Sequence, residues 1–283
     1  MFVTTNVTTY LLIVTTYVTT FSQLFAGACK IKKKSTQAEK NRYRDLVKAK
    51  TKEFIVSKFG VIVYAKDLYK LRPGKRLRDE SINFYLKLLV EKTRSSWNDI
   101  HLMSTFFFHQ YSKNGNVCYK RIERWTRRVK RGVARAKLII FPINIGNDHW
   151  VLMVVSTIVF EHKKEVHHYF KFFDSLGRSG DVYTRAGKKY LQQEYRKKPK
   201  RNKRPGFRVF YHEEDVKCPL QTNGKDCGAH LCANAYCVCH GIGVDTFTSK
   251  DIDFFRQHIA LSIGAGSLQP LVTYPKVPDI TSV

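Results

Sequence analysis

The chain has 283 residues, of which 43% are hydrophobic, so it carries enough apolar material for one sizeable domain with its own core. Its formal net charge of +27 indicates acidic partners: nucleic acid, an anionic membrane surface or an acidic protein. The seven cysteines are odd in number and cluster toward the C-terminus, which argues against a secreted disulfide framework and for a reducing compartment.

The N-terminal 29 residues carry no charged side chain and are rich in Thr, and a run of lysines follows at once. This stretch is long enough to span a bilayer, and the lysines would then keep the downstream domain on the cytoplasmic side. A cleaved signal and a soluble or disordered leader are alternatives that the sequence leaves open. Residues 30–54 are expected to form a basic linker, 55–263 a single domain and 264–283 a flexible tail.

The first half of the domain offers few periodic segments. Residues 59–64 (FGVIVY) predict a short strand, and 80–93 predict a helix with apolar residues at helical spacing. The very basic segment 118–137 is predicted to be helical. Three continuous apolar runs, at 138–143, 151–160 and 168–173, predict strands of one central sheet.

Helical patterns dominate the second half. A helix is expected over 184–196, and the basic run 196–204 (RKKPKRNKR) is expected to be a solvated loop. An apolar helix follows over 228–239, and the last helix, 249–263, is expected to begin with Ser249 as its cap.

The segment PLQTNGKDCG (219–228) carries the strongest chemical signal. Its Asn-Gly pair predicts a turn, and an apolar helix starts directly after Cys227. A cysteine at the mouth of a helix is exposed to free N–H groups and to the helix dipole, both of which favour a thiolate. Gly228 leaves room for a substrate carbonyl, while the Cys227 N–H and the neutral amide of Gln221 are expected to form an oxyanion hole.

A nucleophilic thiolate also needs a base and a group that orients the base. His149 follows a predicted turn (Gly-Asn-Asp) between two apolar strands, which places it at the edge of a sheet. Asp174 ends the next apolar run. From the end of that strand, its carboxylate is expected to accept a hydrogen bond from the far ring nitrogen of His149. The predicted catalytic residues therefore occur in the order His149, Asp174, Gln221, Cys227.

The segments PIN…HW (142–150), FDSLG (173–177) and PLQTNGKDCG, in this order, resemble the Ulp/SENP family of cysteine proteases over about residues 60–260. Members cleave SUMO and related ubiquitin-like proteins from precursors and from modified lysines. The resemblance implies an α+β, papain-like fold with a central mixed sheet flanked by helices and the nucleophile at a helix N-terminus. It also implies a deSUMOylating isopeptidase without a cofactor or metal, acting on a SUMO-like partner as a monomer.

By the same resemblance, Trp150 corresponds to the tryptophan that covers the narrow channel for a Gly-Gly tail. The family usually has a Trp-Leu-Asn-Asp-like motif before its first long helix, and that Trp forms the other wall of the channel. Here the matching residues are Arg76-Leu77-Arg78-Asp79. Arg76 and Asp79 are therefore expected at the substrate channel, and Gly-Gly selectivity is in doubt.

Alternatives remain open. The same residues suit a viral or mobile-element endoprotease, or an acyltransferase resembling bacterial effectors. A non-catalytic, basic nucleic-acid-binding protein on the same fold is a third interpretation. A zinc site is less favoured, because the cysteines among its candidate ligands lack the usual Cys-x-x-Cys spacing. These candidate ligands are His230, Cys232, Cys237, Cys239 and His240.

The basic runs at 120–137 and 196–204 have three interpretations: solvated faces, signals for a nuclear location, or docking surfaces for an acidic modifier or nucleic acid. Few aromatic residues interleave with the second run, so the sequence does not indicate a stacking platform for single strands. The expected location is nuclear or cytoplasmic, with a membrane anchor as the open alternative.

Overall fold

The computed structural model describes residues 30–31, 34–93, 99–113, 116–127, 129 and 131–273. The expected leader or membrane segment at 1–29 and the last part of the expected tail, 274–283, lie outside the described residues. Within the part that is described, no helix combines the length and apolar character needed to cross a bilayer.

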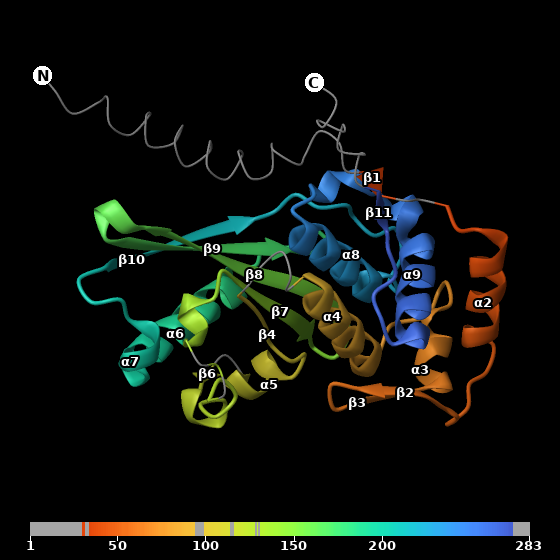
Figure 1. Ribbon diagram of the computed structural model, residues 1–283, viewed down its shortest axis with the longest axis horizontal. Coiled ribbons are helices and arrows are strands. Elements are labelled where there is room, and N and C mark those ends of the chain that lie inside the picture. Colours follow the sequence, from red (N-terminus) through yellow and green to blue (C-terminus); the bar gives the residue numbers. More distant parts are fainter. Residues whose placement is uncertain are drawn as a thin grey trace, which may run out of the picture.

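A five-stranded sheet forms the centre of the molecule (Figure 1). Its strand order is β10-β9-β8-β7-β4, where β10 and β4 run parallel to their neighbours and the other pairs are antiparallel. The bounds are β4 Ile100–Leu102, β7 Leu138–Ile145, β8 His149–Phe160, β9 Glu165–Phe173 and β10 Arg208–Asp215. The predicted central sheet, and its mixed character, are confirmed.

The continuous apolar runs are explained by burial of both faces of the sheet. Along β8, Trp150, Leu152 and Val154 pack into one hydrophobic cluster. The alternate residues Val151 and Met153 pack into a second cluster on the other face. If β8 had polar residues at every second position, one of the two hydrophobic clusters would lose the apolar side chains that β8 supplies.

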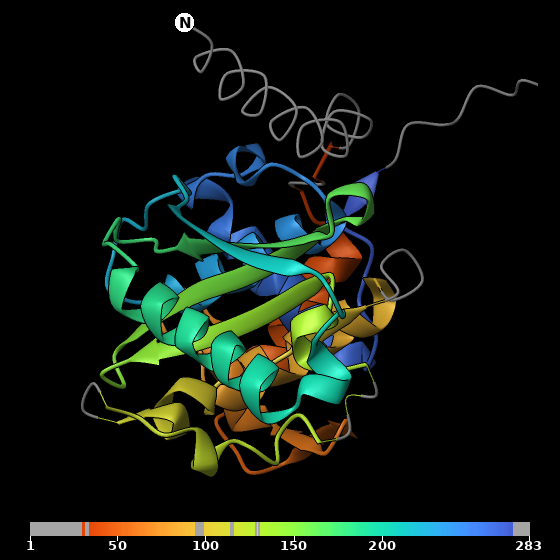
Figure 2. The ribbon, with the colours of Figure 1, turned by 90° about the vertical axis from the view of Figure 1, so that its left-hand side faces the viewer.

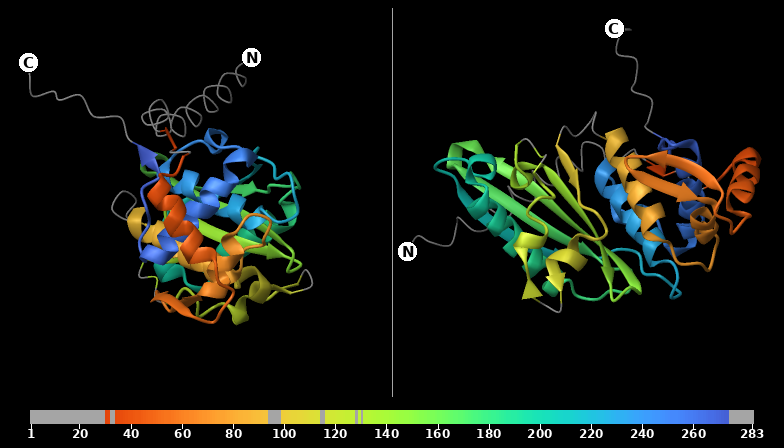
Figure 3. Two further views of the ribbon diagram at one scale, coloured as in Figure 1. Left: turned by 90° about the vertical axis from the view of Figure 1, so that its right-hand side faces the viewer. Right: turned by 90° about the horizontal axis from the view of Figure 1, so that it is seen from below.

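Helices cover the two faces unequally (Figures 2 and 3). One face carries α4 (Asp79–Thr93), α8 (Cys227–His240) and α9 (Ile252–Ala265), with α2 (Gln37–Val47) packed outside α9. The opposite face carries α5 (Phe107–Tyr111) and α6 (Asp181–Lys197), followed by the short α7 (Pro199–Asn202). The predicted helices at 80–93, 184–196 and 228–239 agree with α4, α6 and α8 to within three residues at each end.

The remaining elements are short. They are β1 Lys30–Ile31, β2 Phe54–Lys58, β3 Val61–Tyr64, α3 Ala65–Leu68, β5 Ser112–Lys113, β6 Asn116–Val117 and β11 Val272–Thr273. Single 3₁₀ turns occur at Tyr69–Leu71, Tyr119–Arg121, Val133–Arg135, Glu161–Lys163, Val244–Thr246 and Ser249–Asp251.

The expected basic linker and flexible tail both contain ordered structure. In the segment 30–54, α2 begins with a capping box formed by Thr36 and Glu39 and packs against α9. In the segment 264–283, α9 ends at Ala265, Leu271 is 2% exposed, and β11 pairs with β1. Both ends of the described chain therefore add to the domain expected over 55–263.

Two predicted elements differ at their starts. The strand expected at 59–64 is the second half of a hairpin of β2 and β3, because Phe59 and Gly60 adopt positive φ angles of 58° and 72° and form its turn. The last helix is preceded by a 3₁₀ turn that Thr248 caps together with Asp251, so Ser249 is not the cap.

The prediction of a helix over 118–137 is wrong. The described part of this segment forms two 3₁₀ turns and irregular chain, with Gly132 at a φ of 80°. The prediction that 196–204 is wholly solvated is also wrong, because the segment includes α7 and Asn202 is 1% exposed. Both segments are held by side chains of distant elements, which sequence periodicity does not report.

Candidate active site

The hairpin of β8 and β9 brings His149 and Asp174 together. His149 begins β8 after a turn in which Gly146 and Asn147 both have a φ of 60°, and Asp174 directly follows β9. The His149 Nε2–H donates to Asp174 Oδ1 at 2.6 Å, and the Leu176 N–H donates to the same oxygen at 2.7 Å. The carboxylate is thus fixed by the backbone, and it fixes the imidazole.

Cys227 is the first residue of α8 and packs under β8, where it is 1% exposed. Burial raises the pKa of its thiol. Hydrogen bonds with His149 and with the backbone of Trp150 and Gly228 outweigh burial, so that the pKa of Cys227 is lowered. The predicted placement of this cysteine at a helix mouth, facing His149, is observed.

The imidazole shows the complementary shift. Burial lowers the pKa of His149, but hydrogen bonds with Asp174 and Cys227 raise it to about 9. Because Nε2 bonds to Asp174, Nδ1 is the ring nitrogen that remains for the thiol. Burial raises the pKa of Asp174, and the bonds from His149 and Leu176 lower it overall. These directions favour a thiolate–imidazolium pair at neutral pH.

Gln221 is held in place by the residue that follows Asp174. The Ser175 hydroxyl donates to Gln221 Oε1 at 2.7 Å, and the Gln221 N–H donates to the Ser175 carbonyl at 2.8 Å. Gln221 Nε2 donates to the Asn223 carbonyl at 2.5 Å. A primary amide has two N–H bonds, so one remains for a developing oxyanion, and this role stays a prediction.

Gly228 lies where a side chain does not fit. A Cβ at this position would lie 2.9 Å from Leu77 Cβ and 3.3 Å from Trp150 Cδ1. Trp150 is itself 5% exposed, and its indole N–H donates to the Leu77 carbonyl at 3.3 Å. The start of α8 is therefore enclosed by the residue after the base and by the segment before α4.

Arg76 joins the two loops that carry the base and the nucleophile. Its Nε donates to the Gly224 carbonyl at 3.1 Å, and its Nη1 pairs with Asp148, the residue before His149. Asp79 begins α4 nearby. The arginine that stands at the expected tryptophan position thus crosses between the loops, and the substrate contacts of Arg76 and Asp79 stay predictions.

Sequence reasoning missed a buried ion pair behind the nucleophile. Arg256 of α9 is fully buried, and its Nη2 and Nε donate to Asp226 Oδ1 at 2.6 Å and 3.1 Å. Asn223 Nδ2 donates to the other oxygen of Asp226 at 2.6 Å. The guanidinium also donates to four backbone carbonyls, those of Lys70, Arg72, Lys75 and Lys225. The sequence pair Asp226-Cys227 was the available signal for this ion pair. A carboxylate directly before the nucleophile would oppose a thiolate unless a cation neutralised it.

Three of the other described cysteines lie in a different chemical environment. Burial raises the pKa of Cys218 to about 11 and of Cys237 and Cys239 to about 12. All six cysteines within the described ranges are free thiols. Across the same ranges, no group of three or more His, Cys, Asp or Glu side chains is arranged to hold a metal ion, the candidate zinc ligands of α8 included.

Comparison with known proteins decides the family. The model of the Ulp1 protease family, C-terminal catalytic domain, matches residues 75–271, which include His149, Asp174, Gln221 and Cys227. The chain belongs to the Ulp1 protease family. The predicted resemblance to Ulp/SENP proteases is confirmed.

Relatives in this family are found in animals, plants and fungi. Human Sentrin-specific protease 2 is 30% identical over 214 residues, which cover 75% of this chain and 33% of the human protein. The putative ubiquitin-like-specific protease 1B of Arabidopsis thaliana is 30% identical over 236 residues, covering 81% of this chain and 63% of the relative. The chain thus matches about a third of the length of the human relative.

Solved structures of Ulp1 proteases share the fold. The C-terminal protease domain of Ulp1 in complex with Smt3, the yeast ortholog of SUMO, aligns with a TM-score of 0.64 at 23% identity, over 83% of this chain and 97% of that one. The Ulp1-like SUMO protease domain of Chaetomium thermophilum aligns with a TM-score of 0.66 at 19% identity, over 85% and 93%. The predicted α+β protease fold is confirmed.

Proposed function

We propose that this Ulp1-family chain is a cysteine peptidase that releases a SUMO-like modifier from its precursor or from a modified lysine. The observation that carries the proposal is the His149 imidazole held between Asp174 and Cys227. In this arrangement a thiolate is available without an external base. The relatives named as Sentrin-specific and ubiquitin-like-specific proteases support the substrate class.

The reaction is acyl transfer followed by hydrolysis. The Cys227 thiolate attacks the carbonyl carbon of the modifier's C-terminal glycine, and the carbonyl becomes an oxyanion near the Cys227 N–H and Gln221. The His149 imidazolium then gives its proton to the leaving amine, which departs. Neutral His149 next takes a proton from water, the water attacks the thioester, and the thiolate is released. Asp174 holds the ring in place throughout.

In this proposal the substrate tail runs along Trp150 and reaches Cys227 at the start of α8. Because Gly228 has no Cβ to press on Leu77 and Trp150, the start of α8 packs against both and leaves little width beside Cys227, which suits a tail that ends in glycines. Arg76 replaces one aromatic wall with a cation that is already bound to Asp148 and Gly224. We therefore expect tolerance of substrates beyond a strict Gly-Gly ending.

The chemistry of the cysteines supports a location. Free thiols in the described residues favour a reducing compartment, nuclear or cytoplasmic. The comparisons do not favour the endoprotease or scaffold interpretations of the same residues. Membrane association of residues 1–29 and a monomeric state stay predictions.

The proposal is tested with modifiers that carry an electrophile at their C-terminal glycine. The full chain is incubated with SUMO, ubiquitin and other modifier probes, and covalent adducts are read by mass. We expect an adduct with the SUMO probe that maps to Cys227, disappears in Cys227→Ala and persists in the matched control Cys118→Ala. A ubiquitin adduct alone would correct the substrate class, whereas no Cys227 adduct with any probe would reject the peptidase.

A further inference from the structure

Two basic segments that are far apart in sequence lie against each other. The Lys198 Nζ of the second segment donates to the Glu123 carbonyl of the first at 2.7 Å. Arg201 Nη1 donates to the Arg127 carbonyl, also at 2.7 Å. A Cβ at Gly132 would lie only 2.6 Å from the Arg201 carbonyl oxygen, so the two backbones are in close contact. The two predicted charge runs therefore form one surface.

A buried carboxylate holds this surface together. The side chain of Glu194 is 1% exposed, and its Oε1 accepts hydrogen bonds from the Tyr119 hydroxyl at 2.7 Å and from Thr126 at 3.0 Å. It also accepts from Lys198 at 3.0 Å, and its Oε2 accepts from Asn202 at 3.3 Å. Both basic segments are thus anchored to α6 through one well-satisfied acid, which fixes the position of one segment relative to the other.

The exposed side of this surface, here called the basic face, is defined by five exposed cations from each segment. They are Lys120, Arg121, Arg124, Arg127 and Arg131, and Arg196, Lys197, Lys200, Arg201 and Lys203. Within the described residues of 119–131 and 196–203, Glu123 is the single exposed carboxylate. The face also carries Trp125, which is 38% exposed. Such a concentration of one sign attracts polyanions.

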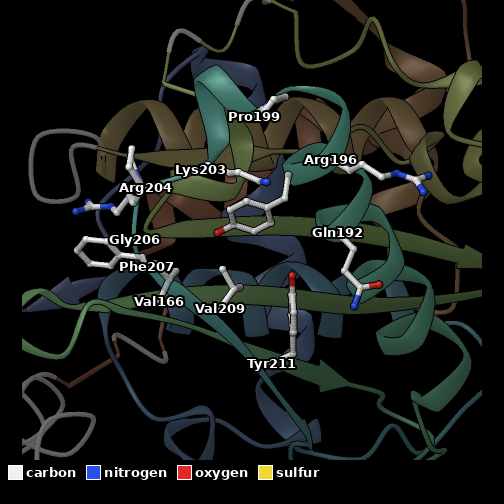
Figure 4. Close-up of a pocket in the computed structure, with 12 residues that line it drawn as sticks. Val166, Gln192, Arg196, Pro199, Lys203, Arg204, Gly206, Phe207, Val209 and Tyr211 are labelled. Carbon is white, nitrogen blue, oxygen red and sulfur yellow. The ribbon is translucent and has the colours of Figure 1, made fainter.

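Aromatic side chains border the basic face in a hollow of about 550 Å³, which is within the roughly 300–1,000 Å³ of ligand pockets. Figure 4 shows the Lys203 amino group directed into the hollow and the Tyr211 hydroxyl pointing toward it, with Arg196 and Arg204 extending to opposite sides. Twelve residues line it and none of them is acidic; the cations among them are Arg196, Lys203 and Arg204.

The basic face and the hollow are remote from the catalytic residues. The helix α6 covers the sheet face opposite to α8, which carries Cys227. The hollow lies at the start of β9 near Val166, whereas Asp174 follows the end of this nine-residue strand, roughly 25–30 Å away. A ligand bound here leaves the proposed substrate channel open.

We propose that the basic face and its hollow bind single-stranded nucleic acid. The exposed cations meet the phosphates, and Trp125 and Phe207 offer rings for bases. Few aromatic residues occur within the second basic run, but the fold supplies Phe207 from the loop before β10 and Trp125 from the first basic segment. An acidic protein is less suited, because its carboxylates are not each accompanied by a flat ring as phosphates are in a nucleic acid, and because the proposed modifier site is on the other face of the sheet.

The test measures binding of a fluorescent single-stranded oligonucleotide to the full chain by anisotropy over a range of salt concentrations. In the triple variant Lys197→Gln/Lys200→Gln/Lys203→Gln, we expect about tenfold weaker binding at moderate salt and a salt slope reduced by about 2. The matched control Lys40→Gln/Arg42→Gln/Arg44→Gln removes the same charge from α2 and is expected to weaken binding less than twofold. Phe207→Ser is expected to weaken single-strand binding several-fold.

Three results would overturn the assignment. Equal weakening by both triple variants would mean that net charge alone attracts the oligonucleotide. Duplex DNA or an acidic peptide that binds as tightly as the single strand would exclude recognition through base stacking. Unchanged binding in Phe207→Ser would do the same. Reaction of Cys227 with the modifier probe is the folding control, and it is expected to be unaffected in all variants.

Discussion

Replacing His149 with alanine is expected to lower kcat/KM for hydrolysis of a SUMO-tipped fluorogenic substrate by about 10⁴-fold. The variant loses the imidazolium that lowers the pKa of Cys227 and that, in the proposed mechanism, gives its proton to the leaving amine. Since the channel residues Trp150 and Gly228 remain, KM is expected to change much less than kcat. Steady-state kinetics over a substrate series gives both constants.

The control for this experiment is His162→Ala, which removes an exposed histidine from the turn between β8 and β9. It is expected to keep kcat/KM within about twofold, as surface substitutions usually do. A His149→Ala enzyme with kcat within tenfold of the parent would show that another group serves as the base. The assignment of His149 would then be wrong even if Cys227 is the nucleophile.

Replacing Arg256 with methionine is expected to lower the free energy of unfolding by about 3–5 kcal/mol. The side chain is fully buried and pairs with Asp226, so its removal leaves a buried carboxylate without its cation and with the Asn223 amide as a neutral partner. Four backbone carbonyls also lose a donor. Urea denaturation of both proteins, followed by circular dichroism, measures the difference.

The matched control is Arg42→Met on the exposed side of α2, which is expected to change the free energy of unfolding by no more than about 0.5 kcal/mol. The double variant Asp226→Leu/Arg256→Met is expected to be less destabilised than the sum of the single variants, because neither charge is left alone. If Arg256→Met unfolds at the same urea concentration as Arg42→Met, the ion pair does not stabilise this part of the fold.

The catalytic residues were predictable from sequence, because short local patterns define the turn and the helix that carry them. The turn before His149 and the helix that starts at Cys227 follow from Gly, Asn and apolar patterns over fewer than fifteen residues each. Their meeting in space follows from the antiparallel hairpin of β8 and β9 and from α8 packing under it. The predicted turn and helix agree with the structure because the residues that form them are also the residues that include the catalytic side chains.

The features that were missed depend on partners far away in sequence. Arg256 interrupts an apolar helix, and nothing near it indicates that Asp226, thirty residues earlier, neutralises it. The basic segment at 118–137 has helical propensity, yet Tyr119 and Thr126 bond to Glu194 on α6, and the chain follows these anchors instead. A pattern over neighbouring residues can indicate that such a partner is needed, but it does not identify the distant residue that supplies it.

The central claim, a thiolate held by an imidazolium, is tested most directly by the ionisation of Cys227. The ultraviolet absorbance of thiolate is measured from acid to alkaline pH in the parent chain and in Cys227→Ala, and the difference isolates this thiol. The raised pKa values of Cys218, Cys237 and Cys239 keep these residues out of the same pH range.

We expect the difference signal to appear well below the ordinary thiol pKa of about 8.5, because His149, whose pKa is raised to about 9, stays protonated there. As the pH rises through about 9 the imidazolium loses its proton, so the ion pair exists only between the two transitions. In His149→Ala the thiol is expected to ionise at its ordinary pKa or higher. An ordinary pKa in the parent chain, unchanged in His149→Ala, would contradict the account.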